Sequence, residues 1–157
     1  MTIQTRSPRL RRLDRTFARV PIYYITACTH NRRLLLNNAD VHDTFVHFAR
    51  EAANRGAWVG AYVLMPDHLH LFVGFDEQRM NISSWAKSLK NTLSKAMRLQ
   101  GIPSPHWQKT FLDHVLRSEE SYESKWSYVR ENPVRGGLVK RWKDWPYVGE
   151  VHDLPFA

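Results

Sequence analysis

The sequence has a single cysteine, Cys28, among 157 residues. One cysteine excludes an internal disulfide and a zinc site built from cysteine ligands. The sequence also lacks an apolar run of about 18 residues, which a transmembrane helix requires. Its basic N-terminus is not followed by the apolar core of a signal peptide. We therefore expect a cytoplasmic protein with no membrane partner.

Acidic residues are also scarce. The chain has 15 Asp and Glu residues against 23 Lys and Arg residues, a formal net charge of +8. This excess favours a polyanionic partner, and nucleic acid over a membrane surface. A basic protein that binds no polyanion is the alternative. With 43% hydrophobic and 12% aromatic residues, the composition is that of a folded chain, and the length fits one domain.

The hydrophobic pattern predicts an α+β protein with elements in the order β-α-β-β-α-β-α. Strands are expected at 21–29, 58–65, 68–75 and 107–116, and helices at 39–55, 81–99 and 118–131. Ser83 or Ser84 is expected to cap the second helix. The first six elements match a ferredoxin-like split βαβ sheet with its helices on one face. The other face of such a sheet is often left open, and the last helix follows the fourth strand.

No linker or repeat divides the chain, so we expect one domain over residues 1–157. Within it, residues 1–19 form a basic N-terminal arm with six arginines, and residues 141–157 form a loop-like C-terminal segment. Arg11 and Arg12 are the arm's candidate phosphate contacts. A solvated terminus without a ligand is the alternative reading of the arm.

Two histidines stand one residue apart in an otherwise apolar run, Tyr-Val-Leu-Met-Pro-Asp-His-Leu-His-Leu-Phe-Val, at residues 62–73. In a strand, His68 and His70 point to the same face, whereas Leu69 and Leu71 point to the core. Two neutral imidazoles on one face can bind a divalent metal ion. Asp67 is a rival ligand, but within the strand it would point the other way. A pair of ordinary surface histidines is the alternative, since the pattern alone is weak.

Two histidines are fewer protein ligands than zinc requires, and the sequence has no His-Glu-x-x-His motif. Magnesium or manganese needs fewer, because water and a substrate phosphate complete its coordination. The histidine pair therefore favours Mg²⁺ or Mn²⁺ over zinc.

The last predicted helix carries a tyrosine away from its apolar side. Tyr122, Trp126 and Val129 have the spacing of a core stripe. Tyr128 lies about 100° or more from that stripe, and Asn132, four residues later, falls on nearly the same side. Tyr128 and Asn132 can thus face a common site. A surface tyrosine lying on a neighbouring element is the alternative.

The histidine run, followed by Tyr-Val-Arg-Glu-Asn-Pro-Val-Arg-Gly-Gly-Leu-Val at 128–139, resembles the REP-associated tyrosine transposases. These belong to the single-tyrosine HUH transposases, named for a His, a hydrophobic residue and a His. The resemblance covers residues 21–147. It implies that His68 and His70 bind metal, that Tyr128 is the nucleophile, and that Asn132 offers a third, amide-type ligand. Tyr122, the rival nucleophile, lies on the core stripe and lacks the Asn-Pro-Val-Arg context.

The resemblance implies metal-dependent cleavage and strand transfer in single-stranded DNA through a 5′-phosphotyrosine link. The substrate would carry a hairpin, typically a repetitive extragenic palindrome. Backbone phosphates would meet a set of cations on the second and third helices and beyond: Lys87, Lys90, Arg130, Arg135 and Lys140. Each of these alone is also compatible with a solvated surface charge. Related enzymes act as monomers or homodimers, so both states stay open.

Three other functions remain as alternatives. The first is a non-cleaving hairpin DNA or RNA-binding module with the same electrostatics. The second is a metallohydrolase that activates water, which would form no covalent adduct and would survive Tyr128→Phe. The third is a protein-interaction domain, which would leave the positive charge without a role.

Overall fold

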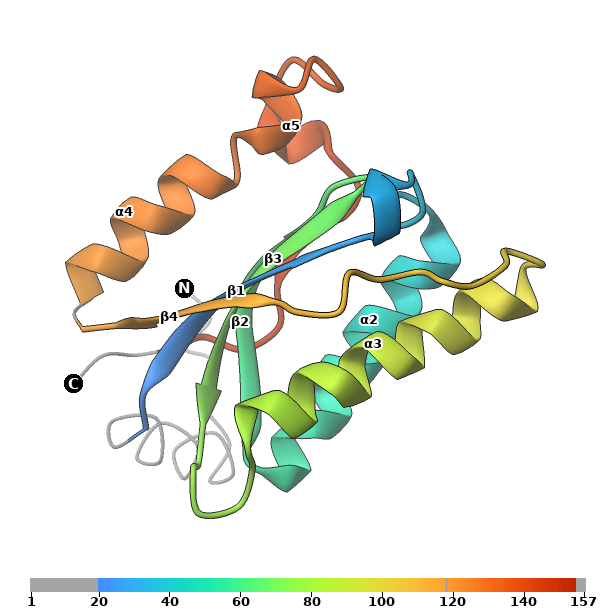
Figure 1. Cartoon of the computed structure of the whole chain (residues 1–157). Coiled ribbons are helices and arrows are strands. Elements are labelled where there is room, and N and C mark those ends of the chain that lie inside the picture. The colour runs from blue at the N-terminus through green and yellow to red at the C-terminus, as the bar shows by residue number, and fades with distance from the viewer. Residues whose placement is uncertain (1–19, 118, 155–157) are drawn as a thin grey trace, which may run out of the picture.

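A computed structural model describes residues 20–117 and 119–154. It contains one antiparallel sheet with the spatial order β4-β1-β3-β2-β5 (Figure 1). The strands are β1 (Ile22–Cys28), β2 (Ala57–Leu64), β3 (His68–Phe75), β4 (Leu112–Leu116) and β5 (Val148–Glu150). Strands β1 to β4 have the order of a split βαβ sheet. One helix connects the inner strand β1 to the outer strand β2, and a second connects the inner strand β3 to the outer strand β4. The predicted ferredoxin-like α+β fold is confirmed.

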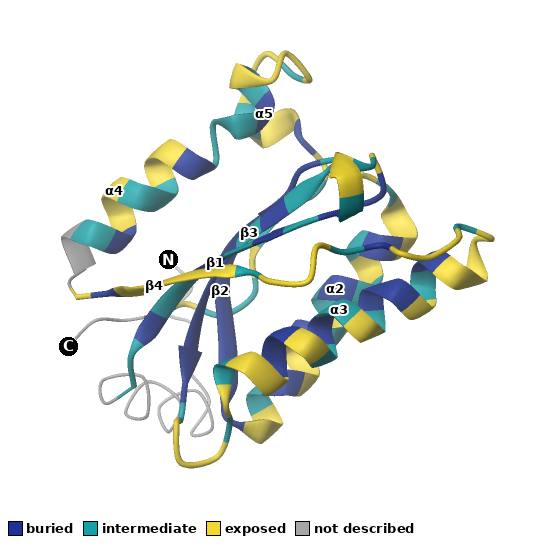
Figure 2. Cartoon of the chain, in the orientation of Figure 1, coloured by how far each residue is buried: buried dark blue, intermediate teal, exposed yellow. Residues whose placement is uncertain are grey.

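Helices α2 (Ala39–Ala52) and α3 (Ile82–Leu99) cover one face of this sheet (Figures 1 and 2). Alternate residues of β3, Leu69, Leu71 and Val73, are fully buried beneath them, as a period of two requires. A short 3-10 helix, Ala53–Arg55, follows α2, and Gly56 ends it. The φ angle of Gly56 is 95°, in the left-handed region that favours glycine.

Helix α4 (Glu119–Val129) and the four-residue α5 (Asn132–Arg135) lie over the opposite face (Figure 1). Tyr122 of α4 is buried there against Phe72 of β3, with their ring centroids 4.5 Å apart. The expectation of an open face was therefore wrong over much of the sheet. Trp58 and Phe72 point from the strands to that side and form a second, smaller hydrophobic core with Tyr122. Helix α4 therefore has an apolar surface on which to pack.

The C-terminal segment departs from the predicted loop at 141–157. It contains a 3-10 turn, Trp142–Asp144, and the short strand β5, which pairs antiparallel with β2. Trp145 is buried, and its indole N–H donates to the Leu64 carbonyl over 2.9 Å. A strand of three residues has too little alternation to be recognised locally; the β2 edge supplies its partner.

The fourth strand is shorter than predicted, because only 112–116 pair with β1. Residue 107 instead makes an isolated bridge to Thr29. The Trp107 indole N–H donates to Lys90 O and Ser94 Oγ, each over 3.1 Å, which fixes this connection to α3. None of the helices in the described part of the chain is long and apolar enough to span a membrane.

The N-cap of α3 is Asn81, not Ser83 or Ser84 as expected. Its side-chain oxygen accepts from the backbone N–H groups of Ser83 and Ser84, over 2.9 and 3.1 Å. We expect Asn81→Ala to lower the free energy of unfolding by about 1 kcal/mol, because two amide hydrogens lose their acceptor. Ser83→Ala is the matched control and should change it by less than about 0.5 kcal/mol. Urea unfolding measures both, and equal losses would contradict the cap assignment.

Candidate active site

His68 and His70 project from β3 toward the α4 side of the sheet, with their ring centroids 4.8 Å apart and an interplanar angle of 79°. Their neighbours across the sheet are on β1, where Cys28 pairs with His68 and Thr26 pairs with His70. The predicted common orientation of the two rings is confirmed. It follows from the two-residue period of a strand.

Two hydroxyl groups hold His70. Its Nδ1 lies 2.7 Å from Tyr24 Oη and 2.8 Å from Thr26 Oγ1, and the Tyr24 ring stacks on the imidazole at 5.5 Å. Burial, followed by the charges of His68 and Lys125, lowers the pKa of His70 to about 3. His70 is therefore neutral at pH 7. When Nδ1 donates its hydrogen to a hydroxyl, Nε2 keeps a lone pair for a metal.

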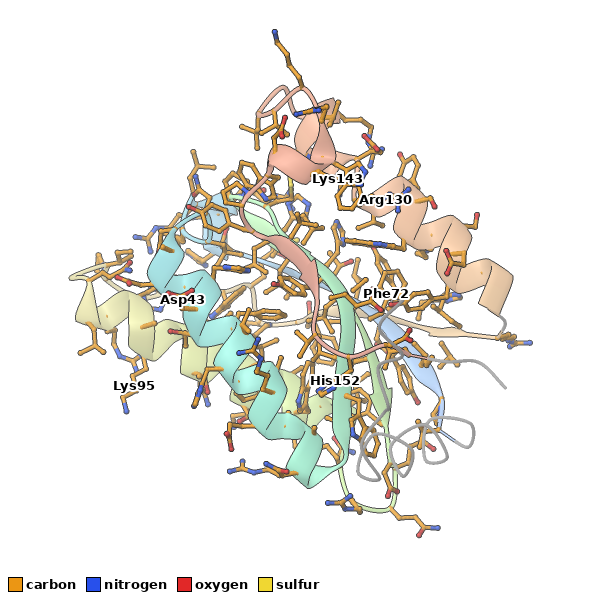
Figure 3. The ribbon with its side chains drawn as sticks, turned by 180° about the vertical axis from the view of Figure 1, so that it is seen from behind. Asp43, Phe72, Lys95, Arg130, Lys143 and His152 are labelled. Atoms are coloured by element: carbon orange, nitrogen blue, oxygen red, sulfur yellow. The ribbon has the colours of Figure 1, made fainter. Side chains whose placement is uncertain are left out.

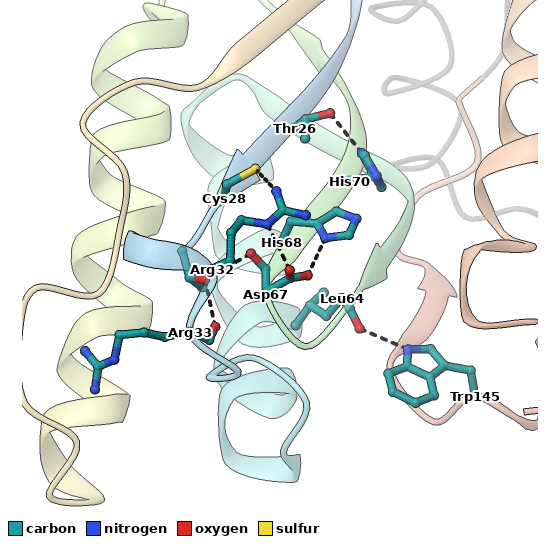
Figure 4. Close-up of polar contacts among 10 residues, drawn as sticks. Thr26, Cys28, Arg32, Arg33, Leu64, Asp67, His68, His70 and Trp145 are labelled. Atoms are coloured by element: carbon teal, nitrogen blue, oxygen red, sulfur yellow. Dashed lines mark hydrogen bonds and ion pairs between the residues drawn. The ribbon is translucent and has the colours of Figure 1, made fainter. Parts of the chain in front are cut away.

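Asp67 holds His68. The Asp67 Oδ1 atom lies 2.7 Å from His68 Nδ1, and Oδ2 accepts from Arg32 Nε over 2.9 Å (Figure 4). Burial would raise the pKa of Asp67, but hydrogen bonds and charges from His68 and Arg32 outweigh it and keep this pKa below its usual value. An ionised carboxylate only accepts, so Nδ1 of His68 carries a hydrogen, and in the neutral form of the ring Nε2 has the lone pair.

The orientation of Asp67 corrects the expectation that its side chain points away from the histidines. Strand β3 begins at His68, so Asp67 lies just before the strand and does not follow its alternation. Its carboxylate folds back onto the His68 ring. Carboxylates that accept from the second nitrogen of a metal-binding histidine fix its tautomer and ring orientation.

In the described part of the chain, the histidine pair supplies fewer side-chain ligands than a structural zinc site uses. Across residues 20–117 and 119–154, no three His, Cys, Asp or Glu side chains converge as metal ligands. The histidine pair alone offers two Nε2 atoms, which leaves coordination positions for an amide oxygen, water or phosphate. Asn132, the expected third ligand, begins α5, and its Oδ1 accepts a hydrogen bond from Arg135.

Tyr128 is on the exposed side of α4, as the helical period predicted. Its side chain is 67% exposed, whereas Tyr122 and Val129 are buried. The Arg135 guanidinium lies 3.9 Å from the centroid of the Tyr128 ring, and its Nη2 donates to the Tyr128 carbonyl over 2.7 Å. Arg135 thus contacts both Tyr128 and Asn132, which gathers three of the expected site residues at the α4–α5 junction.

The environment of Tyr122, the rival nucleophile, differs from that of Tyr128. Its Oη accepts from the Ala61 N–H over 3.0 Å, and burial raises the pKa of Tyr122 far above its ordinary value. A phenol that is buried and committed to a backbone amide resists deprotonation.

Lys125 connects the tyrosine helix to the histidines. Its Nζ lies 4.6 Å from the Tyr24 ring centroid, and Tyr24 is the residue that stacks on His70. Sequence reasoning missed Lys125, although it lies one turn before Tyr128. Its position adds positive charge between α4 and the histidine face.

The cations expected to contact DNA do not form one surface. Arg11 and Arg12 lie outside the described residues. Lys87 is exposed on α3, in the layer on the other side of the sheet from the histidines. Lys90 donates to the carbonyls of Gln108 and Thr110 over 2.9 and 3.1 Å, which ties down the α3–β4 connection.

The remaining cations gather at the other end of the molecule. Arg130 lies over the Trp142 ring at 4.7 Å, and Lys140 lines a groove of about 470 Å³ with Trp142 and Lys143. Figure 3 shows Arg130 and Lys143 far from Lys95, which lies on the outer surface of α3. Arg130, Arg135 and Lys140 therefore surround the α4–α5 region, while Lys87 and Lys90 do not.

The family described as transposase IS200-like matches residues 20–130. The chain belongs to this family. Among curated relatives, it is 27% identical over 125 residues to the REP-associated tyrosine transposase of Escherichia coli (strain K12), covering 80% of this chain and 73% of that one. It is 29% identical over 104 residues to a putative REP-associated tyrosine transposase of Haemophilus influenzae, covering 60% and 59%. The resemblance found in the sequence motifs is confirmed.

Solved structures agree on the fold. A REP-associated tyrosine transposase bound to a REP hairpin superposes with a TM-score of 0.67 at 23% identity, covering 85% of this chain and 88% of that one. A putative transposase from Deinococcus radiodurans superposes with a TM-score of 0.53 at 22% identity, covering 71% and 90%. Membership of the IS200-like transposases implies an enzyme that cleaves and rejoins DNA.

Proposed function

We propose that this transposase cleaves and rejoins single-stranded DNA through Tyr128, assisted by a divalent ion on His68 and His70. The observation that carries the proposal is the fixed orientation of the two imidazoles, each with its Nδ1 in a hydrogen bond, which leaves Nε2 as the ring nitrogen for a metal. A pure binding module gains nothing from an Asp67–His68 pair and a half-buried, neutral His70. Asn132 is the proposed third ligand, once its amide leaves Arg135.

In the proposed reaction, Tyr128 Oη attacks the scissile phosphorus. A bond forms between Oη and phosphorus, the bond from phosphorus to the 3′-oxygen breaks, and the 3′-oxygen takes up a proton as the phenol loses one. The products are a 5′-phosphotyrosine link and a free 3′-OH. A second 3′-OH then attacks the same phosphorus and loses its proton, the bond from phosphorus to Tyr128 Oη breaks, and the phenol regains a proton. The strand is rejoined with one ester bond exchanged for another, so no ATP is consumed.

Mg²⁺ or Mn²⁺ would supply Lewis acidity toward a non-bridging oxygen of that phosphate. The chain's own residues do the positioning. Asp67 fixes the tautomer of His68, and the Tyr24 and Thr26 hydroxyls orient His70. Lys125 adds positive charge beside the histidines, where the phosphate would lie.

The proposed partner is single-stranded DNA with a hairpin, of the repetitive extragenic palindrome type. A structural neighbour is bound to a REP hairpin, and two relatives are described as REP-associated. The net charge of +8 fits such a polyanion. Arg130, Arg135 and Lys140 are the proposed contacts nearest to Tyr128, and Lys87 and Lys90 are more remote ones. Arg11 and Arg12, outside the described residues, are proposed contacts as well.

Cleavage polarity tests this function. A hairpin oligonucleotide labelled in turn at each end is incubated with protein and Mn²⁺, and the products are separated under denaturing conditions. The fragment that begins at the cleaved phosphate should migrate with the protein, and the other fragment should end in a 3′-OH. Cleavage with no linked protein would favour a hydrolase that uses water. Hairpin binding without cleavage would favour the non-cleaving module.

A substitution at Asp67 tests the metal site independently of cleavage. Asp67→Ala should weaken Mn²⁺ binding by about 10- to 100-fold, because the His68 ring loses the acceptor that fixes its tautomer. Calorimetric titration of the DNA-free protein with Mn²⁺ measures this. Asp43→Ala, which removes an exposed carboxylate from α2, is the matched control. This variant should bind Mn²⁺ with the affinity of the parent protein. Equal affinities for the two variants would contradict a role for Asp67.

A further inference from the structure

The turn that follows β1 has a backbone conformation that ordinary residues avoid. Asn31 and Arg32 have φ angles of 51° and 54°, and neither is glycine. Two consecutive residues in the left-handed region cost conformational free energy, since a Cβ atom crowds the backbone there. Such strain persists only where the surroundings enforce it, and it gathers at functional sites.

Residues on both sides of the turn enforce it. Thr29 Oγ1 donates to the carbonyls of Arg33 and Asp67, over 2.7 and 3.0 Å. The Arg33 guanidinium donates to the carbonyls of Pro103 and Pro105, each over 2.8 Å. The turn is thereby tied to the start of β3 and to the α3–β4 connection.

The strained turn places the Arg32 guanidinium beside the His68 ring (Figure 4). Its Nε donates to Asp67 Oδ2 over 2.9 Å, and its Nη1 donates to Cys28 Sγ over 3.0 Å. The side chain is nevertheless 52% exposed. A guanidinium has five N–H donors, and these two contacts use two of them. Up to three donors remain for a ligand on the histidine face.

These contacts orient the plane of the guanidinium without enclosing it. A residue needed only to support Asp67 could be buried and could come from an unstrained loop. An arginine held rigidly, half in solvent, next to two imidazoles has the geometry that binds phosphate oxygens.

We propose that Arg32 is a further catalytic residue, which binds a non-bridging oxygen of the scissile phosphate and neutralises the charge that develops there as Tyr128 attacks. The inference rests on the proposed function. Arg32 forms no covalent bond and transfers no proton; it donates hydrogen bonds that strengthen when the phosphorus becomes five-coordinate. Preorganised donors of this kind stabilise the transition state more than the bound substrate.

The test compares an ordinary scissile phosphate with a methylphosphonate. In the methylphosphonate, a methyl group replaces one non-bridging oxygen, and the negative charge of the phosphate is lost. On the phosphate, Arg32→Ala should form the protein–DNA adduct about 100- to 1,000-fold more slowly than the parent at saturating DNA. Its affinity for the hairpin should change by less than about threefold, since many other phosphate contacts remain. On the methylphosphonate diastereomer whose methyl group replaces the oxygen that Arg32 binds, the gap between parent and variant should shrink to less than about tenfold, because the acceptor of the Arg32 hydrogen bonds is gone.

Two further variants control for the loss of a positive charge and for the shape of the guanidinium. Lys95→Ala removes an equal charge from the outer surface of α3 and should react like the parent. Arg32→Lys keeps the charge but loses the planar fork, and should be slowed by about tenfold or more. An Arg32→Ala defect of the same size on the phosphate and on both diastereomers would overturn the inference while leaving the proposed function intact. Absence of any adduct from the parent protein would overturn both.

Discussion

Tyr128→Phe is expected to abolish the covalent protein–DNA adduct, with a loss of at least about 1,000-fold in single-turnover cleavage. The substitution removes one oxygen atom, the proposed nucleophile, from a side chain that is 67% exposed. Phenylalanine keeps the ring over which the Arg135 guanidinium lies at 3.9 Å. Stability and hairpin affinity should therefore match the parent, and a denaturing gel with labelled hairpin DNA measures the loss directly.

Tyr122→Phe is the matched control, and the opposite pattern is expected. Its hydroxyl accepts from the Ala61 N–H inside the protein, over 3.0 Å. Removing that acceptor should cost about 1–3 kcal/mol of stability, while the adduct still forms below the unfolding temperature. An adduct that survives Tyr128→Phe but disappears in a folded Tyr122→Phe protein would reverse the assignment.

His70→Ala is expected to weaken Mn²⁺ binding by at least about 100-fold and to leave no measurable adduct. His70 is one of only two imidazoles in the proposed site, and burial keeps it neutral and ready to bind. The change also removes the partner on which Tyr24 stacks, so folding must be checked by thermal unfolding. Titration calorimetry with Mn²⁺, in the absence of DNA, gives the affinity.

His47→Ala controls for the loss of an imidazole as such. His47 is exposed on α2, in the layer on the other side of the sheet. The His47→Ala protein should bind Mn²⁺ and form the protein–DNA adduct as the parent protein does. A His70→Ala protein that is folded and binds Mn²⁺ with parental affinity would contradict the histidine site, even if its cleavage were impaired.

Periodicity explains why the orientation of the main proposed site residues was predictable. His68 and His70 share a face because they are two residues apart in a strand, and the strand begins at the predicted residue. Tyr128 is exposed because it lies off the stripe formed by Tyr122 and Val129. These inferences depend only on local geometry, which the sequence carries.

The supporting residues were missed because their geometry is not periodic. Asp67 lies one residue before β3, so the alternation that was applied to it does not hold there. Arg32 reaches Asp67 across 35 positions of sequence, from a left-handed turn that contains no glycine. Neither the turn nor the contact has a local signature. The cap at Asn81 and the strand β5 were missed for related reasons, since several polar residues compete for a cap and three residues show no pattern.

The cationic set shows a different limit of sequence reasoning. Charge alone predicts a polyanionic partner, but it does not say which side of the sheet each side chain faces. Lys90 was expected to meet DNA, yet it is committed to two carbonyls of the chain, and burial lowers its pKa. Lys125, which was not chosen, lies over the Tyr24 ring, which stacks on His70.

The most direct test of Tyr128 as the nucleophile is mass spectrometry of the trapped adduct after digestion with trypsin and nuclease. Cleavage after Lys125 and Arg130 releases the peptide Trp-Ser-Tyr-Val-Arg, whose only tyrosine is Tyr128, while Tyr122 falls in the preceding peptide. The expected result is a nucleotide joined through its 5′-phosphate to the 126–130 peptide. A nucleotide on the Tyr122 peptide, or cleaved DNA with no modified peptide, would contradict it.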